Sequence, residues 1–179
     1  MENKTNIVLI GMPGVGKSTI GVVLAKVLGY HFVDADILIQ EQENRLLHEI
    51  IEEEGIEGFL AVENRVNSQI NEKKAVISTG GSVVYGREAM KHLSEIGTVI
   101  YLKIGYKTLE KRLSDLHGRG VVLREGQDLR ALYEERTPLY EKYADVVVDE
   151  EGLTVEETLQ NILKIYCAFQ KEKERNTPK

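Results

Sequence analysis

The stretch TNIVLIGMPGVGKST, residues 5–19, decides the fold, because an apolar run leads directly into a glycine-rich segment that ends in a lysine and two hydroxyls. From Gly11 to Ser18 it fits the phosphate-loop pattern G-x-x-x-x-G-K-[ST] without a gap. Glycines let backbone N–H groups turn inward around a polyphosphate, the lysine reaches the outer phosphates, and the serine hydroxyl ligates Mg²⁺. The stretch therefore predicts a strand, a loop and a helix that bind a nucleoside triphosphate. The nucleotide-binding residues expected here are Gly11, Pro13, Gly14, Val15, Gly16, Lys17, Ser18 and Thr19.

The composition of the chain narrows the class of protein. Its 179 residues are enough for one domain with a substantial core. The formal net charge of -6 disfavours nucleic acid and anionic lipid as partners. Cys167 is the single cysteine, which excludes an internal disulfide and indicates a cytoplasmic protein. The apolar run at 7–10 is too short for a signal or a membrane span, and the four histidines form no metal cluster with cysteine. We expect a monomer that binds a small molecule.

Apolar runs alternate with amphipathic segments along the whole chain. Strands are expected at 5–10, 31–36, 75–81, 98–104 and 145–149. Helices are expected at 17–28, within 37–71 with a break near Glu54–Gly55, and at 87–96, 107–116, 129–143 (interrupted near Thr137–Pro138) and 154–169. This alternation predicts a parallel sheet covered on both faces, with ligands beyond the carboxyl ends of its strands. We expect one domain over residues 1–170 and a frayed tail at 171–179.

Two carboxylates, Asp34 and Asp36, end the second expected strand. An aspartate at this place is often simply a helix N-cap. Beside a magnesium nucleotide, however, one carboxylate can hold the metal, directly or through water, and the other can accept or orient a hydroxyl proton. Their spacing on a strand predicts that both side chains point the same way.

A segment rich in glycine and arginine, residues 117–126, is either a solvated surface loop or a lid. A kinase that must exclude water needs a closing lid, and a lid arginine can neutralise charge on the transferred phosphoryl group. We favour Arg119, which lies between Gly118 and Gly120, over Arg124 for this role.

Together these motifs resemble the shikimate kinase family. GMPGVGKSTIG, FVDAD, EGIEGF with a glutamate shortly after it, STGG, YLKI, the basic lid and ERTPLYEKYADVVVD follow one another in that family's order, from about residue 5 to 165. The phosphate loop alone is generic to nucleotide kinases, whereas the ordered combination is specific. The resemblance implies a three-layer α/β/α P-loop kinase fold with a five-stranded parallel sheet of order 2-3-1-4-5. It also implies an acceptor-binding helical region at about 37–72, a lid at about 117–127, and phosphorylation of the 3-hydroxyl of shikimate by ATP and Mg²⁺ in aromatic amino acid biosynthesis.

The resemblance further implies a role for each matched residue. Lys17 and Ser18 match the phosphate and magnesium residues, and Asp34 matches the carboxylate that holds magnesium through water. Asp36 matches the acceptor-binding carboxylate and candidate base, and Arg136 matches an arginine that grips the acceptor's carboxylate. Arg112 matches the residue that packs on adenine, and Arg119 is similar to the lid arginine. The acceptor-binding residues implied in this way are Asp36, Leu60, Glu63, Gly80, Gly81, Ser82 and Arg136; the catalytic ones are Lys17, Asp36 and Arg119.

The acceptor half departs from the family's pattern. The family has a second arginine for the acceptor's carboxylate where this chain has Leu60, its triple glycine is here Gly80–Gly81–Ser82, and its Arg-Pro-Leu lid is here Arg119–Gly120–Val121. A helical count places Leu60 about 100° from Phe59, off the apolar stripe of that helix. Either shikimate is held weakly, or Arg65 or Arg87 supplies the missing charge. Glu63 lies nearer the apolar stripe, where a carboxylate is costly without a partner. It therefore needs Arg136, another basic group or a proton.

Three functions therefore stay open. The first is phosphorylation of shikimate, and the second is phosphorylation of another polyol or hydroxy acid by a related kinase. The third is nucleotide binding without acceptor chemistry.

Overall fold

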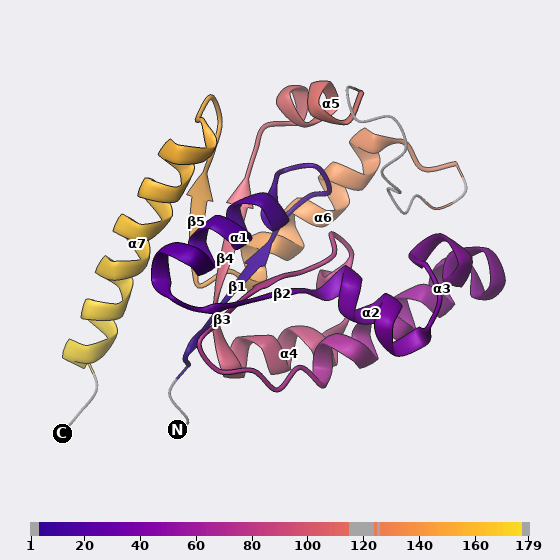
Figure 1. The fold of residues 1–179 in the computed structure, drawn as a ribbon. Coiled ribbons are helices and arrows are strands. Elements are labelled where there is room, and N and C mark those ends of the chain that lie inside the picture. Colours follow the sequence, from indigo (N-terminus) through magenta and orange to yellow (C-terminus); the bar gives the residue numbers. More distant parts are fainter. Residues whose placement is uncertain (1–3, 115–123, 125, 177–179) are drawn as a thin grey trace.

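A five-stranded parallel sheet forms the centre of the computed structural model, which describes residues 4–114, 124 and 126–176 (Figure 1). The strand order is β2-β3-β1-β4-β5, as the resemblance implied. The strands are β1 (Asn6–Ile10), β2 (His31–Asp34), β3 (Ala75–Ser78), β4 (Gly97–Lys103) and β5 (Val146–Asp149). All residues of β1 and β3 are buried, because helices cover both faces of the sheet.

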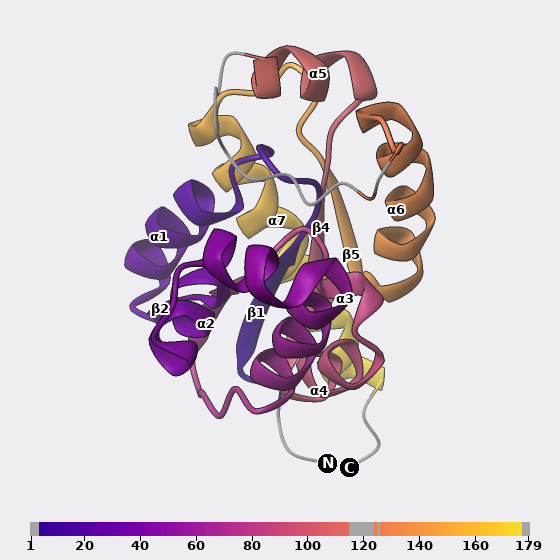
Figure 2. The same ribbon diagram turned by 90° about the vertical axis from the view of Figure 1, so that its right-hand side faces the viewer.

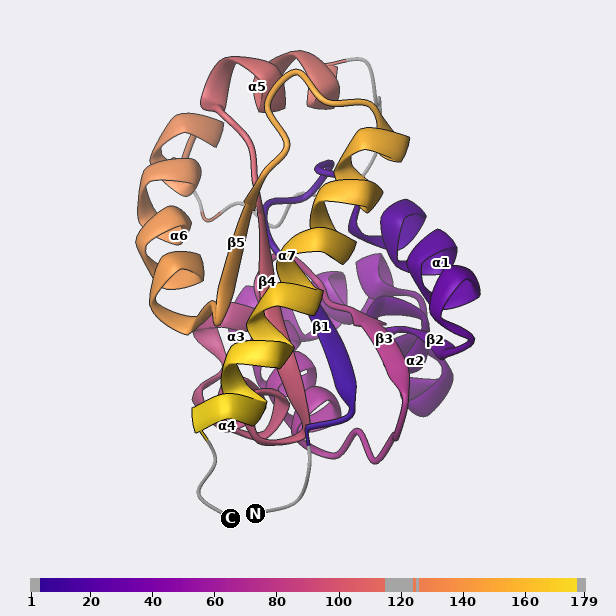
Figure 3. The same ribbon diagram turned by 90° about the vertical axis from the view of Figure 1, so that its left-hand side faces the viewer.

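Four helices cover the two faces of this sheet. α1 (Lys17–Leu28) and α7 (Val155–Asn176) contact each other on one face, which Figure 3 shows. α4 (Arg87–Ile96) and α6 (Leu129–Tyr143) pack on the other face, and α5 (Tyr106–Ser114) lies beyond the carboxyl ends of the strands (Figure 1). The register pairs Val8 of β1 with Ile77 of β3 and with Val99 of β4, so the loops that follow these strands begin at one edge. No helix in the described part of the chain has the length and apolar character needed to cross a membrane.

The helical region between β2 and β3 has a small core of its own. α2 (Ala35–Glu43) packs against α3 (Leu47–Ser68), and Figure 2 shows the two helices together with α4. Gly55 interrupts α3 with a φ of 71°, close to the predicted break. The buried members of this second core are Ile39, Ile50, Phe59, Val62 and Val66. A short 3-10 helix, η1 (Val83–Tyr85), follows the glycines after β3.

Several predicted boundaries are wrong. β3 ends at Ser78 and not at residue 81, so the glycines after it lie outside the strand. β2 ends at Asp34 and α2 starts at Ala35, so Asp36 lies in a helical turn and not on a strand. α6 continues through Pro138, because the buried side chains of Leu132, Arg136 and Tyr140 fix one face of the helix against the fold. α7 runs to Asn176, beyond the predicted end at 169.

Candidate active site

The phosphate loop joins the end of β1 to the start of α1. Its last glycine, Gly16, is the N-cap of α1 and has a φ of 100°, which an L side chain rarely adopts. Gly11 has no room for a side chain, since a Cβ there would lie 2.7 Å from the carbonyl oxygen of Leu102. The loop therefore brings backbone N–H groups and the N-terminus of a helix to one point, which is a site for a phosphate group.

Lys17 lies across this loop with its ammonium group turned inward. Its Nζ donates to the carbonyl oxygens of Gly11 at 2.8 Å and Met12 at 3.0 Å. Burial lowers the pKa of Lys17 to about 8, against the opposing charge of Asp36. A phosphate beside Nζ would favour the charged form, because it adds a close negative charge.

Ser18 and Asp34 form the part of the site suited to Mg²⁺. The hydroxyl of Ser18 donates to Asp34 Oδ2 at 2.7 Å and lies 3.2 Å from the hydroxyl oxygen of Ser78. Asp34 is also the N-cap of α2, since its Oδ1 accepts from the N–H of Asp36 at 3.0 Å. The described residues contain no cluster of three His, Cys, Asp or Glu side chains that could hold a metal. One carboxylate with a hydroxyl fits Mg²⁺, which takes its other ligands from water and phosphates.

One cavity of about 570 Å³ connects the phosphate loop with the expected acceptor residues. From the acceptor set it includes Asp36, Glu63, Gly80, Gly81, Ser82 and Arg136, all predicted from the sequence. It also includes five residues outside the quoted motifs, Gln40, Leu46, Leu47, His48 and Ile51, and two residues within them that were given no role, Phe59 of EGIEGF and Thr79 of STGG. Most of these lie on α2 and α3, where only their place in the region 37–72 could have suggested a role. Ser78, the first residue of STGG, was also given no role, although its place at the end of β3 was a usable signal.

Two glycines after β3 let charged side chains approach one another. A Cβ on Gly80 would lie 2.9 Å from Asp36 Oδ1 and even closer to Glu63 Oε1. A Cβ on Gly81 would lie 2.7 Å from Pro13 and 3.2 Å from a terminal nitrogen of Arg136. Tyr140 fixes this loop, because its hydroxyl donates to the carbonyl oxygen of Gly81 at 2.5 Å.

Asp36 and Glu63 are carboxyl groups with raised pKa values. Burial raises the pKa of Asp36, the charge of Asp34 adds to the effect, and Lys17 opposes it. Burial raises the pKa of Glu63 to about 7, while a hydrogen bond from Ser82 lowers it. Glu63 is 1% exposed, and its Oε1 has no hydrogen-bond partner within the described part of the chain. Near neutral pH, the carboxyl group of Glu63 is therefore protonated in some folded molecules and ionised in others.

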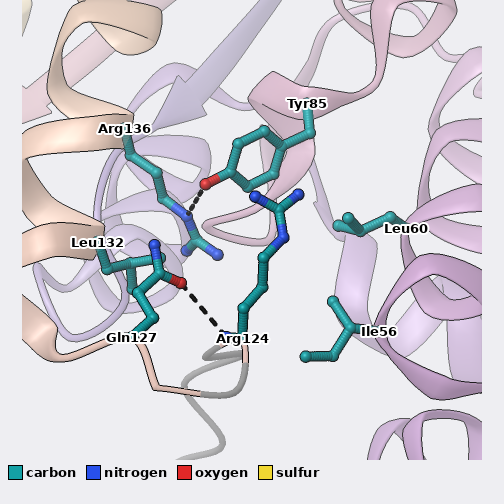
Figure 4. Close-up of a pocket in the computed structure, with 7 residues that line it drawn as sticks. All are labelled: Ile56, Leu60, Tyr85, Arg124, Gln127, Leu132 and Arg136. Carbon is teal, nitrogen blue, oxygen red and sulfur yellow. Dashed lines mark hydrogen bonds between the residues drawn. The ribbon is translucent and has the colours of Figure 1, made fainter.

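Arg136 brings a buried positive charge into the cavity from α6. It is 2% exposed, and its Nε donates to the hydroxyl of Tyr85 at 3.3 Å. A second, small pocket lies on its other side, and Leu60 and Arg124 line it (Figure 4). Arg65, which pairs with Glu43, and Arg87, at the start of α4, do not line either cavity. The structure does not bring the two arginines considered as replacements to the acceptor site.

Arg112 lies behind the phosphate loop. It donates to the carbonyl oxygen of Val15 at 3.1 Å and to Glu150 Oε1 at 2.9 Å. Glu150 was not predicted from the sequence, and burial raises its pKa while Arg112 lowers it. Arg119, with Gly120 and Val121, lies outside the described residues, so its role as the lid arginine stays a prediction.

A parallel sheet with a phosphate loop at one end, and a cavity that joins this loop to charged acceptor-side residues, defines a P-loop kinase that acts on a small molecule. The model of the shikimate kinase family matches residues 13–167. The shikimate kinase of Thermodesulfovibrio yellowstonii is 38% identical over 164 residues, which cover 90% of this chain and 94% of that protein. That of Legionella pneumophila (strain Corby) is 39% identical over 162 residues, which cover 89% and 93%.

Solved structures agree with these sequence relatives. The shikimate kinase from Acinetobacter baumannii in complex with shikimate has a TM-score of 0.84 and 30% identity, covering 93% of this chain and 95% of that one. The shikimate kinase from Aquifex aeolicus has a TM-score of 0.74 and 30% identity, covering 91% and 96%. The chain belongs to the shikimate kinase family.

Proposed function

We propose that this protein transfers the γ-phosphoryl group of ATP to the 3-hydroxyl of shikimate, with Mg²⁺ as the metal. The observation that carries the proposal is the cavity of about 570 Å³, in which Lys17 and Ser18 of the phosphate loop share one space with Asp36 and Arg136. The relatives named shikimate kinase, one of them solved with shikimate bound, support the choice of acceptor.

Each side chain has a distinct part in this reaction. Asp36 accepts or orients the proton of the acceptor hydroxyl, and its raised pKa makes it a stronger base than an exposed aspartate. Lys17 stabilises the negative charge on the phosphates during transfer, and Arg136 binds the acceptor's carboxylate. Mg²⁺, bound by Ser18 and Asp34, would neutralise phosphate charge.

Leu60 favours a second candidate function. Where the family has a cation for the acceptor's carboxylate, this chain presents an apolar side chain beside Arg136. That change suits an acceptor with a less demanding anionic group, such as another polyol or hydroxy acid.

A coupled assay of ADP formation tests these functions. Shikimate should stimulate ATP turnover more than any member of a panel of polyols and hydroxy acids. Stimulation by another compound would support the second candidate, and a protein that binds ATP without stimulation by any acceptor would be a nucleotide-binding protein only.

Lys17→Ala should lower turnover by roughly 10²-fold or more, because it removes a charge beside the transition state. Lys26→Ala is a matched control, since Lys26 lies exposed in the last turn of the same helix. Its turnover should equal that of the wild type. A Lys17→Ala protein with wild-type turnover would contradict the kinase assignment.

A further inference from the structure

Two arginines, not one, meet beside Leu60. We propose that Arg124 supplies the second cation for the acceptor's carboxylate, from the segment before α6 rather than from α3. The proposal rests on the proposed function, since it concerns a carboxylate-bearing acceptor in the same cavity. It replaces the expectation that the loss of an arginine at residue 60 leaves only a weak hold on shikimate.

Tyr85 brings the two guanidinium groups together. The guanidinium carbon of Arg136 lies 5.2 Å from the centre of the Tyr85 ring, and that of Arg124 lies 5.5 Å from the same centre. Figure 4 shows both side chains converging on this ring, with Leu60 and Ile56 opposite. A cation over an aromatic face is stabilised by the ring, which offsets part of the repulsion between two like charges. An anion placed between the two guanidinium groups would offset the remaining repulsion.

The backbone of Arg124 is held in place by a turn that leads into α6. The N–H of Gln127 donates to the carbonyl oxygen of Arg124 at 2.9 Å, and the N–H of Arg124 donates to Gln127 Oε1 at 3.3 Å. Gly126 has a φ of 75°, which suits glycine at the third position of such a turn. Asp128, the N-cap of α6, directly follows this turn, and α6 carries Arg136. The start of α6 therefore links the positions of the two arginines.

The present partners of Arg124 are ones that an acceptor can replace. Its terminal nitrogens lie 3.3 Å from Glu135 and 3.5 Å from Glu57, whereas strong charge-assisted bonds are about 2.7–2.9 Å long. Glu135 accepts shorter bonds from the hydroxyl of Tyr85, at 2.6 Å, and from Gln127, at 2.7 Å, so it keeps partners when Arg124 turns to an acceptor. The side chain of Glu57 is 80% exposed, so water can take over its interactions. A carboxylate that contacts Arg124 and Arg136 together would gain shorter bonds to both.

The small pocket and the large cavity meet at Arg136, which lines both. The small pocket holds only about 10 Å³, enough for one water molecule, so the acceptor itself lies in the large cavity. The side chains of Ile56, Leu60 and Leu132 line the small pocket together with Arg124 and Arg136. Apolar neighbours on one side of an ion pair lower the local dielectric and so strengthen it. In this arrangement Leu60 contributes to the anion site without carrying a charge.

Binding and kinetics of Arg124→Gln with two acceptors test the proposal. For shikimate, both the Kd and the KM should rise roughly ten- to a hundredfold, the effect of losing a charged hydrogen-bond partner. For the methyl ester of shikimate, which lacks the charge, the variant should bind like the wild type, and the KM for ATP should stay unchanged. Arg130→Gln is the matched control, because Arg130 pairs with Glu134 on the exposed side of α6.

A second substitution closes a mutant cycle. Leu60→Arg should restore shikimate use in the Arg124→Gln protein and improve the wild type much less, because only the first lacks a second cation. Equal improvement in both backgrounds would overturn the proposal, and so would equal losses for shikimate and its ester.

The outcomes separate this proposal from the proposed function. Turnover of shikimate that Arg124→Gln leaves unchanged overturns the role of Arg124 alone. If shikimate binds in a way that depends on its carboxylate and on Arg124, but is not phosphorylated, the proposed function alone is overturned. A wild-type protein that does not bind shikimate overturns both.

Discussion

Asp34 and Asp36 are two residues apart in the chain, yet their carboxylates have different surroundings. Asp34 accepts from Ser18 and caps α2, whereas Asp36 lines the acceptor cavity in the first turn of that helix. The strand pattern predicted the same direction for both side chains, but the helix begins between them. The N-cap reading and the metal-binding reading of Asp34 are compatible, because its two oxygens have different partners.

Replacing each aspartate by asparagine should separate their roles. Asp36→Asn should lower kcat by roughly 10²–10⁴-fold with little change in the KM for ATP, since it removes a base at the acceptor. Asp34→Asn should keep the fold, because asparagine caps a helix as well as aspartate does. It should instead raise the Mg²⁺ concentration needed for half-maximal rate. Equal loss of ATP affinity with an unchanged kcat in both variants would contradict this division.

Glu63 should make the unliganded protein less stable as the pH rises. The pKa of Glu63 is about 7 in the folded protein, against 4.5 for an ordinary glutamate, which stands for the unfolded chain. Between these two pH values the folded state binds more protons at this group than the unfolded state does. The stabilisation is therefore complete below about pH 4.5 and is lost as the pH rises through about 7, an effect on the order of 3 kcal/mol.

Urea unfolding of Glu63→Gln from pH 5 to 8 measures this effect. The wild type should lose stability relative to the variant as the pH rises, since glutamine does not titrate. Glu41→Gln, at an exposed position on α2, controls for the substitution itself. A difference between wild type and Glu63→Gln that is constant over this pH range would show that Glu63 titrates alike in the folded and unfolded protein.

At the scale of elements, the segment between β3 and η1 leaves little room for an added methyl group. Gly80→Ala should raise the KM for the acceptor and lower stability by roughly 1–3 kcal/mol, because Asp36 and the buried Glu63 have to move. Gly105→Ala is a matched control, since its Cβ would also lie 2.9 Å from a carboxylate oxygen, that of Glu151. Glu151 is exposed and does not line the acceptor cavity, but turning away breaks its bonds from the N–H of Gly105 and the hydroxyl of Thr108. This variant should therefore lose some stability with no change in the KM for the acceptor. Similar acceptor KM values for Gly80→Ala and the wild type would contradict the close packing.

The same scale shows where local patterns lose their predictive value. The five strands and most helices follow from apolar runs and periodicity, and the phosphate loop from a motif eight residues long. The end of β2 does not follow from such patterns, because an aspartate such as Asp34 fits both a strand end and a helix N-cap. The continuity of α6 through Pro138 does not either, since burial of Arg136 and Tyr140 against distant segments outweighs the local cost of proline.

At the scale of the whole molecule, the order of the sheet and the position of the site follow from the resemblance of the ordered motifs. The placement of Arg124 could not be predicted in this way. It depends on a turn before α6 and on the ring of Tyr85, which belongs to η1. Contacts between segments so far apart in the sequence leave no periodic signal, and a loop arginine such as Arg124 looks the same in the sequence whether it faces solvent or a ligand.

The separate core of α2 and α3 has a consequence for how this kinase can evolve. Its five buried side chains belong to a different cluster from the one around the sheet and the phosphate loop. Substitutions at sites that share no partners have nearly additive effects. Mutations that touch only this second core, such as a change at Leu60, which packs against it, therefore need few compensating changes around the nucleotide. Natural selection can change the acceptor while it keeps the ATP-binding half, so new acceptor specificities can arise in this fold by short mutational paths.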